Sequence, residues 1–354
     1  MPVVSAKPLE EFAARVLTAA GLEPEEAAVI AGGLVQANLR GVDTHGVLRL
    51  LQYCDCLAAG EINPRPRVRV VSRSAGAVLV DADGGYGFRP TLLAVELAVE
   101  LAREHGLGLA GVRASHHFGM AAAYAERIAE AGLIGMVTAN TGPVMAPFGG
   151  ARPALGNNPI AFAVPRRPEP PLVLDMALSQ VAFGRIRLAA AEGRPIPTGW
   201  AYDSRGRPTT DAGEALRAGL LAPMGEHKGS GLSLIVDVLA GILTGSPVGH
   251  EADAHGRRRG GVGHLVLALR PDLFLPEAEF HAALERRLTE VLATPPAEGV
   301  ERVLLPGDLE LATARRREAE GIPLSAALAR QLAALAERLG VGPPPWASAP
   351  GESP

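Results

Sequence analysis

Residues 104–119, EHGLGLAGVRASHHFG, decide between two folds for this chain. Within them, Gly106-Leu107-Gly108-Leu109-Ala110-Gly111 matches the G-x-G-x-x-G fingerprint of Rossmann folds. That fingerprint requires a strand before it and a helix after it, so that a pyrophosphate meets the helix N-terminus. Here an apolar helical pattern over Pro90–His105 comes first, and the strand pattern Gly108–Arg113 follows. Because the order is reversed, we expect no Rossmann fold, and the glycines are better explained by a helix C-cap and close packing.

Helical and strand patterns alternate irregularly on both sides of this stretch. Helices are expected at 9–22, 24–41, 44–60, 120–131, 229–244, 276–293 and 323–339. Strands are expected at 134–139, 160–164, 172–175 and 263–269, and a hairpin at 68–80 that turns at 72–76. This irregular alternation predicts an α/β fold with a mixed sheet.

Composition excludes several classes of protein. With 47% hydrophobic and 20% charged residues, the 354-residue chain can bury a sizeable core. A net charge of −4 with scattered lysines and arginines argues against a nucleic-acid surface, and the run Arg257–Arg259 is flanked by glycine and indicates a mobile loop. Cys54 and Cys56 are too few and too close for a disulfide framework or a zinc site. The N-terminus lacks a signal-peptide pattern, and no apolar run of about 18 residues occurs, so we expect a cytoplasmic protein without a membrane span.

The first cluster of chemically active residues is Asp43-Thr44-His45-Gly46, followed by Arg49 and Tyr53. If the segment is helical from Thr44, then His45, Arg49 and Tyr53 project from one face. An imidazole can exchange a proton with a hydroxyl or carbonyl oxygen, and a guanidinium can clamp a carboxylate. The phenol can add one hydrogen bond. Taken alone, a solvated helix face with an Asp43–Arg49 ion pair explains the pattern slightly better.

The second cluster is Ser115-His116-His117-Phe118-Gly119, between a strand and a helix. Adjacent histidines serve as metal ligands, as acid–base groups or as capping residues. No carboxylate or third histidine lies nearby in sequence, although His250, His255 and His264 in a glycine-rich region could supply one. A role at the strand end is plausible because functional sites gather at such loops.

The third cluster, Pro223-Met224-Gly225-Glu226-His227-Lys228-Gly229, opens an apolar helix. A glycine-rich turn at a helix N-terminus can present free amides to an anion, and Lys228 adds a positive charge. The Walker A spacing is absent. A tight connection that needs small residues explains the turn equally well.

Six segments together resemble the type-2 malate/L-lactate dehydrogenase family, from about residue 5 to residue 340. They are GVDTHGVLRL, ASHHFGMAAAYA, LGNNPIAFAVP, LVLDMALSQVAFGRI, IPTGWAYDSRGRPTTDA and APMGEHKGSGLSLIVDVLAGILTG. The family includes ureidoglycolate, sulfolactate and diketogulonate oxidoreductases and cyclic-imine reductases. The resemblance implies a non-Rossmann, mixed α/β fold and a homodimer with active sites near the subunit interface. It further implies a helical domain from residues 1–75 and 275–342 and a mixed-sheet cofactor domain at 76–274. The composition of residues 343–354, rich in proline, glycine and serine, predicts a disordered tail.

The resemblance also implies roles for particular residues. It marks His45 as the acid–base group, His117 as a second substrate or proton-transfer residue and Asp203 as a supporting carboxylate. The substrate-binding set it implies is Thr44, Arg49 and Tyr53. The cofactor-binding set it implies is Asn140, Asp175, Met176, Ala177, Arg185, Lys228, Gly229, Pro306, Gly307 and Asp308, with no metal ligand.

Three positions depart from the pattern that the family shows. Thr44 stands where serine is frequent and keeps the hydroxyl, and Arg185 replaces a frequent lysine with a different geometry. Glu226 replaces a usual glycine and puts a carboxylate beside the expected phosphate site. This last change bears on the choice of cofactor more than on the reaction.

The resemblance predicts an oxidoreductase that moves a hydride between NAD or NADP and a small 2-hydroxy or 2-oxo acid, malate or lactate first. Reductases of cyclic imines (piperideine- or pyrroline-2-carboxylate) and ureidoglycolate- or diketogulonate-type dehydrogenases share the carboxylate clamp. A metallohydrolase built on His45, His116, His117 and the 250–264 region is the alternative from a different class. A pure binding module does not account for the His/Arg/Tyr cluster together with the turn around Lys228.

Overall fold

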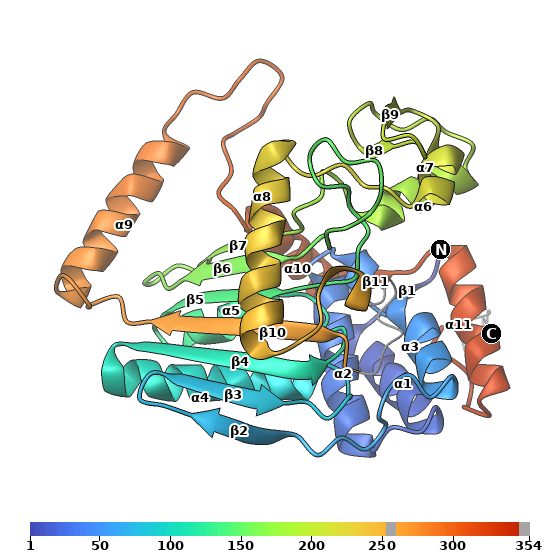
Figure 1. Ribbon diagram of the computed structural model, residues 1–354, viewed down its shortest axis with the longest axis horizontal. Helices are drawn as coiled ribbons and strands as arrows, with labels where there is room; N and C mark the ends of the chain where they lie inside the picture. Colours follow the sequence, from blue (N-terminus) through green and yellow to red (C-terminus); the bar gives the residue numbers. More distant parts are fainter. Residues whose placement is uncertain (253–259, 347–354) are drawn as a thin grey trace, which may run out of the picture.

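The computed structural model describes residues 1–252 and 260–346, and its centre is a seven-stranded mixed sheet (Figure 1). The strand order is β2 (Arg69–Arg73), β3 (Ala77–Asp81), β4 (Leu107–Ser115), β10 (Val262–Leu269), β5 (Ile134–Ala139), β6 (Ile160–Val164) and β7 (Leu172–Met176). Only β3 and β4 pair in parallel, and every other neighbouring pair is antiparallel. The expected strands and the mixed sheet are confirmed.

The rejected fingerprint lies between a helix and a strand, in the predicted order. Helix α4 (Phe88–His105) ends at Gly106, whose φ of +89° is the left-handed C-cap conformation that glycine favours. Strand β4 follows at once, and a Cβ on Gly108 would lie 2.0 Å from the carbonyl oxygen of Ala98. These glycines therefore end a helix and let it pack closely against its strand, and the fold is not Rossmann.

Helices cover both faces of the sheet (Figure 1). On one face, Val266 and Ala268 of β10 pack in the core with α4 and α5 (Ala122–Glu130). On the other, Leu265 meets Val236 beneath α8 (His227–Val236). The helix expected at 229–244 is not one regular α-helix, since α8 continues as a π-helical segment, η2 (Asp237–Gly241), and a 3-10 turn, η3 (Ile242–Thr244).

A second core lies among helices from the two ends of the chain. Helices α1 (Ala6–Ala19), α2 (Pro24–Leu39), α3 (Arg49–Ala58) and α11 (Ala326–Arg338) bury Leu9, Phe12, Ile30, Leu34 and Leu332. The short strands β1 (Val3–Val4) and β11 (Ile322–Pro323) pair antiparallel and join the two ends. Trp346 packs on Phe12 with ring centroids 5.1 Å apart, so the part of the expected tail that is described is ordered.

Two further parts complete the described chain (Figure 1). A small lobe contains α6 (Phe183–Ala191), β8 (Ala201–Tyr202), β9 (Pro208–Thr209) and α7 (Ala212–Ala218). Helix α9 (Glu277–Leu292) stands apart from the sheet and is tied to the β6–β7 turn by the Arg166–Glu285 pair (2.8 Å) and the Arg167–Glu277 pair (3.1 Å). Helix α10 (Asp308–Glu320) leads back to β11.

We propose that the chain divides into the helical and mixed-sheet domains expected from the sequence, each around its own core. The expected first boundary, between residues 75 and 76, falls inside the β2–β3 hairpin, so β2 belongs to the sheet. The run Arg257–Arg259, His255 and residues 347–354 lie outside the described residues. Over 1–252 and 260–346, no helix is long and apolar enough to cross a membrane.

Candidate active site

The segment that carries His45 is not a continuous helix. The prediction that His45, Arg49 and Tyr53 project from one face of a helix that begins at Thr44 is therefore wrong. A 3-10 turn, η1 (Asp43–His45), ends at Gly46, where the backbone is extended (ψ −156°), and α3 begins only at Arg49. Sequence reasoning missed the cause, which is Asn38 at the end of α2. Its Oδ1 accepts from the backbone N–H of Val47 (2.8 Å), and its Nδ2 donates to Asp43 (2.6 Å). A buried amide thus fixes the turn that carries His45.

The expected residues nevertheless meet, through contacts between elements. Arg49 Nε donates to the carbonyl oxygen of Thr44 (2.8 Å), and His45 Nδ1 lies 3.0 Å from Thr44 Oγ1. The imidazole of His117 stacks on that of His45, with centroids 5.4 Å apart and planes 19° apart. Tyr53 completes the group, because its hydroxyl lies 2.5 Å from His117 Nδ1. We call Thr44, His45, Arg49, Tyr53 and His117 the histidine site.

Both imidazoles of the histidine site favour the neutral form. Burial, and secondarily the charge of Arg49, lower the pKa of His45 to about 3. The pKa of His117 lies well below its usual value, first because of burial and then because of Arg49 and His45. The site therefore holds one fixed positive charge, on Arg49.

Arg49 has no carboxylate partner among the described residues. Its side chain donates to the carbonyl oxygen of Thr44 and to Gln52 Oε1 (2.8 Å). Asp43, the partner expected if the segment were a solvated helix face, pairs instead with Arg317 of α10 (2.7 Å). That alternative is wrong. A half-buried guanidinium without an acid is suited to a carboxylate ligand, which it can bind through two parallel hydrogen bonds.

Helix α6 borders the histidine site. A Cβ on Gly184 would lie 3.2 Å from Thr44 Cγ2, so the start of α6 touches the His45 turn. Arg187, one helical turn further, lays its guanidinium over the Phe183 ring at 5.1 Å. The pKa of Arg49 is lowered chiefly by burial, and Arg187 lowers it further. Arg185 is exposed on the same helix, next to Gly184.

The neighbouring histidines are engaged in the protein interior and do not form a metal site. His264 lies in β10, with Nε2 2.9 Å from Ser115 Oγ, and its ring stacks on Phe118 at 4.4 Å. His116 Nε2 accepts from the backbone N–H of Gly260 (3.0 Å). Across the described ranges, no group of three or more His, Cys, Asp or Glu side chains could hold a metal ion. The histidines therefore offer no support to the metallohydrolase alternative.

Three of the residues expected to bind cofactor, Asp175, Met176 and Ala177, lie at the end of β7. Asp175 Oδ2 accepts from the backbone N–H of Ala122 (2.9 Å), which joins β7 to the helix that follows His117. The Asp175 side chain reaches solvent, yet protein surrounds it closely enough that burial raises its pKa to about 6. Met176 and Ala177 are half-buried beside it.

The turn before α8 packs against this strand end, but its amides are not free. Met224 N–H donates to the carbonyl oxygen of Leu178 (2.8 Å), and the N–H groups of Lys228 and Gly229 donate to Gly225 and Met224. The expectation of free amides is therefore wrong for Met224, Lys228 and Gly229. The Lys228 ammonium is exposed and has no carboxylate within ion-pair distance in the described part of the chain. An anion at this turn would therefore meet the Lys228 ammonium and not the N–H groups of Lys228 and Gly229.

The turn Pro306-Gly307-Asp308 lies on the other side of β7. Val173 N–H donates to the Pro306 carbonyl oxygen (3.4 Å), and a Cβ on Gly307, where φ is +92°, would lie 2.9 Å from Val173 O. Asp308 Oδ2 accepts from Leu305 N–H (2.8 Å). Asn140 is fully buried, and its side chain joins Pro247 O (2.8 Å) to Gly263 N (2.7 Å). Its amide is thus engaged within the protein.

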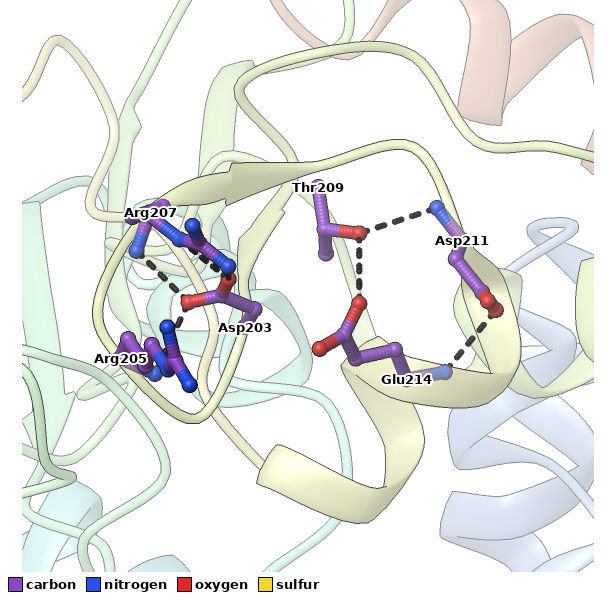
Figure 2. A network of polar contacts seen from close by, with 6 residues as sticks. All are labelled: Asp203, Arg205, Arg207, Thr209, Asp211 and Glu214. Atoms are coloured by element: carbon purple, nitrogen blue, oxygen red, sulfur yellow. Dashed lines mark hydrogen bonds and ion pairs between the residues drawn. The ribbon is translucent and has the colours of Figure 1, made fainter.

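Asp203 is held by its own hairpin (Figure 2). Its carboxylate accepts from the backbone N–H groups of Arg205 (2.8 Å) and Arg207 (2.9 Å) and from Arg207 Nε (2.8 Å). These bonds, that from Arg207 N–H first, hold its pKa below the usual value. Within the described chain it contacts no residue of the histidine site, so its part in catalysis stays a prediction.

A buried network around Asn158 supports the whole region and was not predicted. Asn158 Nδ2 donates to Ser233 Oγ (3.0 Å) and to Asp237 Oδ1 (2.8 Å), and its Oδ1 accepts from Thr141 N–H (2.8 Å). It thereby ties the end of β5 to α8. The Asn157-Asn158 pair beside proline was the available signal, but it is also ordinary turn chemistry.

Comparison with known proteins identifies the family. Residues 4–333 match the family model described as malate/L-lactate dehydrogenase. A (2R)-3-sulfolactate dehydrogenase (NADP(+)) from Chromohalobacter salexigens is 41% identical over 344 residues, 94% of this chain and 98% of that protein. A malate dehydrogenase from Pyrococcus abyssi is 36% identical over 94% of both chains. The solved structure of a delta1-piperideine-2-carboxylate reductase from Pseudomonas syringae superposes with a TM-score of 0.85, at 33% identity, and the match covers 95% of this chain and all of that one. The chain belongs to the malate/L-lactate dehydrogenase family, which confirms the predicted family and its dehydrogenase class.

Proposed function

We propose that this protein reversibly reduces a small 2-oxo acid to a 2-hydroxy acid, with a nicotinamide dinucleotide as redox partner. The unpaired guanidinium of Arg49, beside two neutral stacked imidazoles, carries this proposal. Arg49 binds the substrate carboxylate, which places C2 and its oxygen beside His45. His45 exchanges the proton on that oxygen.

Substrate binding itself prepares His45 for proton transfer. In the ligand-free protein, burial and the charge of Arg49 hold the pKa of His45 at about 3, so the imidazole has no proton to give near neutrality. A bound carboxylate offsets the charge of Arg49 and raises the pKa of His45. Protonation of His45 is therefore coupled to carboxylate binding, and substrate and proton enter the site together.

A second arginine favours a substrate with two negative groups. Arg187 lies on the helix that touches Thr44, and its charge acts on Arg49. No carboxylate pairs with Arg187 among the described residues. Two cations on neighbouring elements, Arg49 in the histidine site and Arg187 at its border, suit a dicarboxylate or a sulfo-carboxylate, the substrates named for the malate and sulfolactate relatives, better than lactate.

The residues near β7 fit a nicotinamide dinucleotide. Lys228 supplies an exposed unpaired cation for a pyrophosphate, and the strand end Asp175–Ala177 lies between the Lys228 turn and the helix that follows His117. The cofactor, when bound, supplies the hydride donor or acceptor. Glu226 places a carboxylate two residues from Lys228, which disfavours an extra phosphate, so we propose NAD over NADP.

We also propose a cytoplasmic homodimer. Six large apolar side chains on α8, η2 and η3 are 41–60% exposed: Leu232, Leu234, Ile235, Val238, Ile242 and Leu243. We call this row the α8 apolar face. An exposed apolar row of this kind is typical of a surface that a second copy covers.

The test is reduced-nicotinamide absorbance with NADH and NADPH against oxaloacetate, sulfopyruvate, pyruvate and a cyclic imine carboxylate. Faster oxidation of NADH than of NADPH, together with faster turnover of the two dianions than of pyruvate, supports the proposed reaction, substrate class and cofactor. Turnover with the imine alone would move the function to amino-acid synthesis, in line with the piperideine carboxylate reductase neighbour. No oxidation by any acceptor contradicts the proposal.

A further inference from the structure

The Tyr53 hydroxyl does not point at a free substrate position. The sequence predicts that this phenol contacts substrate, but its ring is only 2% exposed and its hydroxyl lies 2.5 Å from His117 Nδ1. Tyr86 packs on Tyr53 at 4.4 Å and donates its hydroxyl to the Tyr53 carbonyl oxygen (2.9 Å). The Tyr53 ring thus packs on Tyr86, and its hydroxyl is held by His117.

His117 Nδ1 is an acceptor and carries no proton, because the backbone indicates the direction of both hydrogen bonds at Nδ1 and the shorter one, from Tyr53 (2.5 Å), supplies most of the preference. The N–H of Gly119 points at His117 Nδ1 from 3.2 Å, and a backbone amide can only donate. An Nδ1–H would direct its hydrogen against that amide. The Tyr53 hydroxyl must therefore also donate, so Nδ1 receives two hydrogen bonds.

The two hydrogen bonds to Nδ1 leave Nε2 as the nitrogen of His117 that carries the ring hydrogen. A neutral imidazole whose Nδ1 accepts carries its hydrogen on Nε2. His117 Nε2 has no hydrogen-bond partner within the described ranges and is not sealed from solvent. Beside it, the His45 ring stacks on His117, and its Nδ1 lies 3.0 Å from Thr44 Oγ1. Two stacked imidazoles therefore offer different chemistry.

We propose that Tyr53 is a positioning residue that locks His117 as the Nε2–H tautomer, so that His117 donates a hydrogen bond to the substrate oxygen while His45 alone exchanges the proton. The inference rests on the proposed function only for the identity of that oxygen. No charge is created on His117 during the reaction, and the developing alkoxide is stabilised by a fixed neutral donor.

The electrostatic surroundings agree with this division. The groups that face His117 are Arg49 and Tyr53 from α3, His45 from the η1 turn, His116 beside it and His264 from β10. Burial and these positive or titratable neighbours keep the pKa of His117 well below its usual value. Burial also raises the pKa of Tyr53, so the phenol keeps the hydrogen that it donates.

The first test needs no turnover. In ligand-free protein labelled with ¹⁵N-histidine, long-range ¹H–¹⁵N correlations distinguish protonated from unprotonated ring nitrogens, and a His117→Asn spectrum assigns the signals. We expect a proton on Nε2 and none on Nδ1 from pH 6 to 8 in wild type. Tyr53→Phe should mix the tautomers or raise the pH at which His117 titrates, whereas Tyr86→Phe, which removes the neighbouring hydroxyl, should keep the wild-type pattern. A proton on Nδ1 in wild type, or no change in Tyr53→Phe, overturns the proposal.

The second test separates positioning from folding. Tyr53→Phe should lower kcat about tenfold, the effect of one hydrogen bond, with KM within about twofold. The acid limb of its kcat profile should move to higher pH. Tyr86→Phe should stay within about twofold of wild type in both constants. Equal losses in the two variants would show a purely structural role, and if no acceptor is reduced at all, the tautomer measurement still decides.

Discussion

The Oδ1 atom of Asn38 lies where a side chain on Gly46 would begin, since a Cβ built there would be 2.2 Å from it. The same Oδ1 accepts the N–H of Val47. Gly46 is therefore required by the close approach of a buried amide, and not by its own φ of −86°.

Gly46→Ala should destabilise the protein by about 1–3 kcal/mol, because the overlap forces Asn38 off its two partners. Gly32→Ala is the matched control, since a Cβ in the middle of α2 would meet only Glu10 at 3.6 Å and should stabilise by roughly 0.5–1 kcal/mol. Urea unfolding of both variants tests the pair. Equal stability of the two variants would contradict this account of the turn.

His45→Gln should lower kcat by about 10²–10⁴-fold at saturating substrate, because proton exchange on the substrate oxygen loses its acid–base group. Arg49→Gln should instead act chiefly through KM for the oxo acid. Steady-state kinetics in the reductive direction separates the two. Near-native turnover of His45→Gln would contradict the role of His45 as the group that exchanges the proton on the substrate oxygen.

Arg187→Gln should raise KM for oxaloacetate at least tenfold while changing KM for pyruvate by less than about threefold, as expected for loss of one charged contact to a second carboxylate. Leu188→Gln, at the next position on α6, which is also exposed, is the control. KM values for both acids in both variants decide. A uniform rise for the two acids would place Arg187 outside substrate recognition.

His264 should make stability fall as the pH drops below about 6.5. Burial lowers its pKa to about 3, so the folded state keeps it neutral where the unfolded chain takes up a proton. Its contribution is complete above pH 6.5 and is lost towards pH 3, by up to about 1.4 kcal/mol per pH unit. His264→Gln should flatten this slope in urea titrations from pH 7 to 4.5, and the exposed substitution His227→Gln should leave it unchanged. Identical slopes for wild type and His264→Gln would show that the buried ring does not carry the effect.

Glu226→Gly should stabilise the fold and relax the choice of cofactor. Glu226 has a φ of +57°, which costs a non-glycine residue about 1–3 kcal/mol, and it precedes Lys228 by two positions. Binding of NADPH, followed by calorimetry, should strengthen relative to NADH in the variant. Gly225→Ala, at the same φ of +57°, should destabilise. Unchanged relative affinities would remove Glu226 from cofactor selection.

The sequence predicted what depends on periodicity and on local order. The helix-before-strand order around Gly106 excluded the Rossmann fold, and the apolar runs at 134–139 and 160–164 are β5 and β6. The break at Gly46 could not be predicted in this way, because its cause is a side chain eight residues earlier in another helix.

Hydrogen bonds and ion pairs between residues far apart along the chain could not be predicted from the sequence either. Tyr53 and His117 are 64 positions apart, and Asp43 and Arg317 are 274 apart. The sequence suggested an Asp43–Arg49 ion pair because a helical pattern predicts contacts only between residues that are close in the sequence. Asp43 pairs instead with Arg317 on α10, so Arg49 has no carboxylate partner among the residues that the structure describes.

The α8 apolar face carries a consequence for folding itself. If a second copy covers it, much of the stabilisation of α8 exists only after two chains meet, and association and folding become one equilibrium. The unfolding midpoint should then rise with protein concentration, and dilution should loosen the helix whose first turn presents Lys228. The concentration of the protein would then determine what fraction of the chains has an ordered α8 and therefore a complete active site.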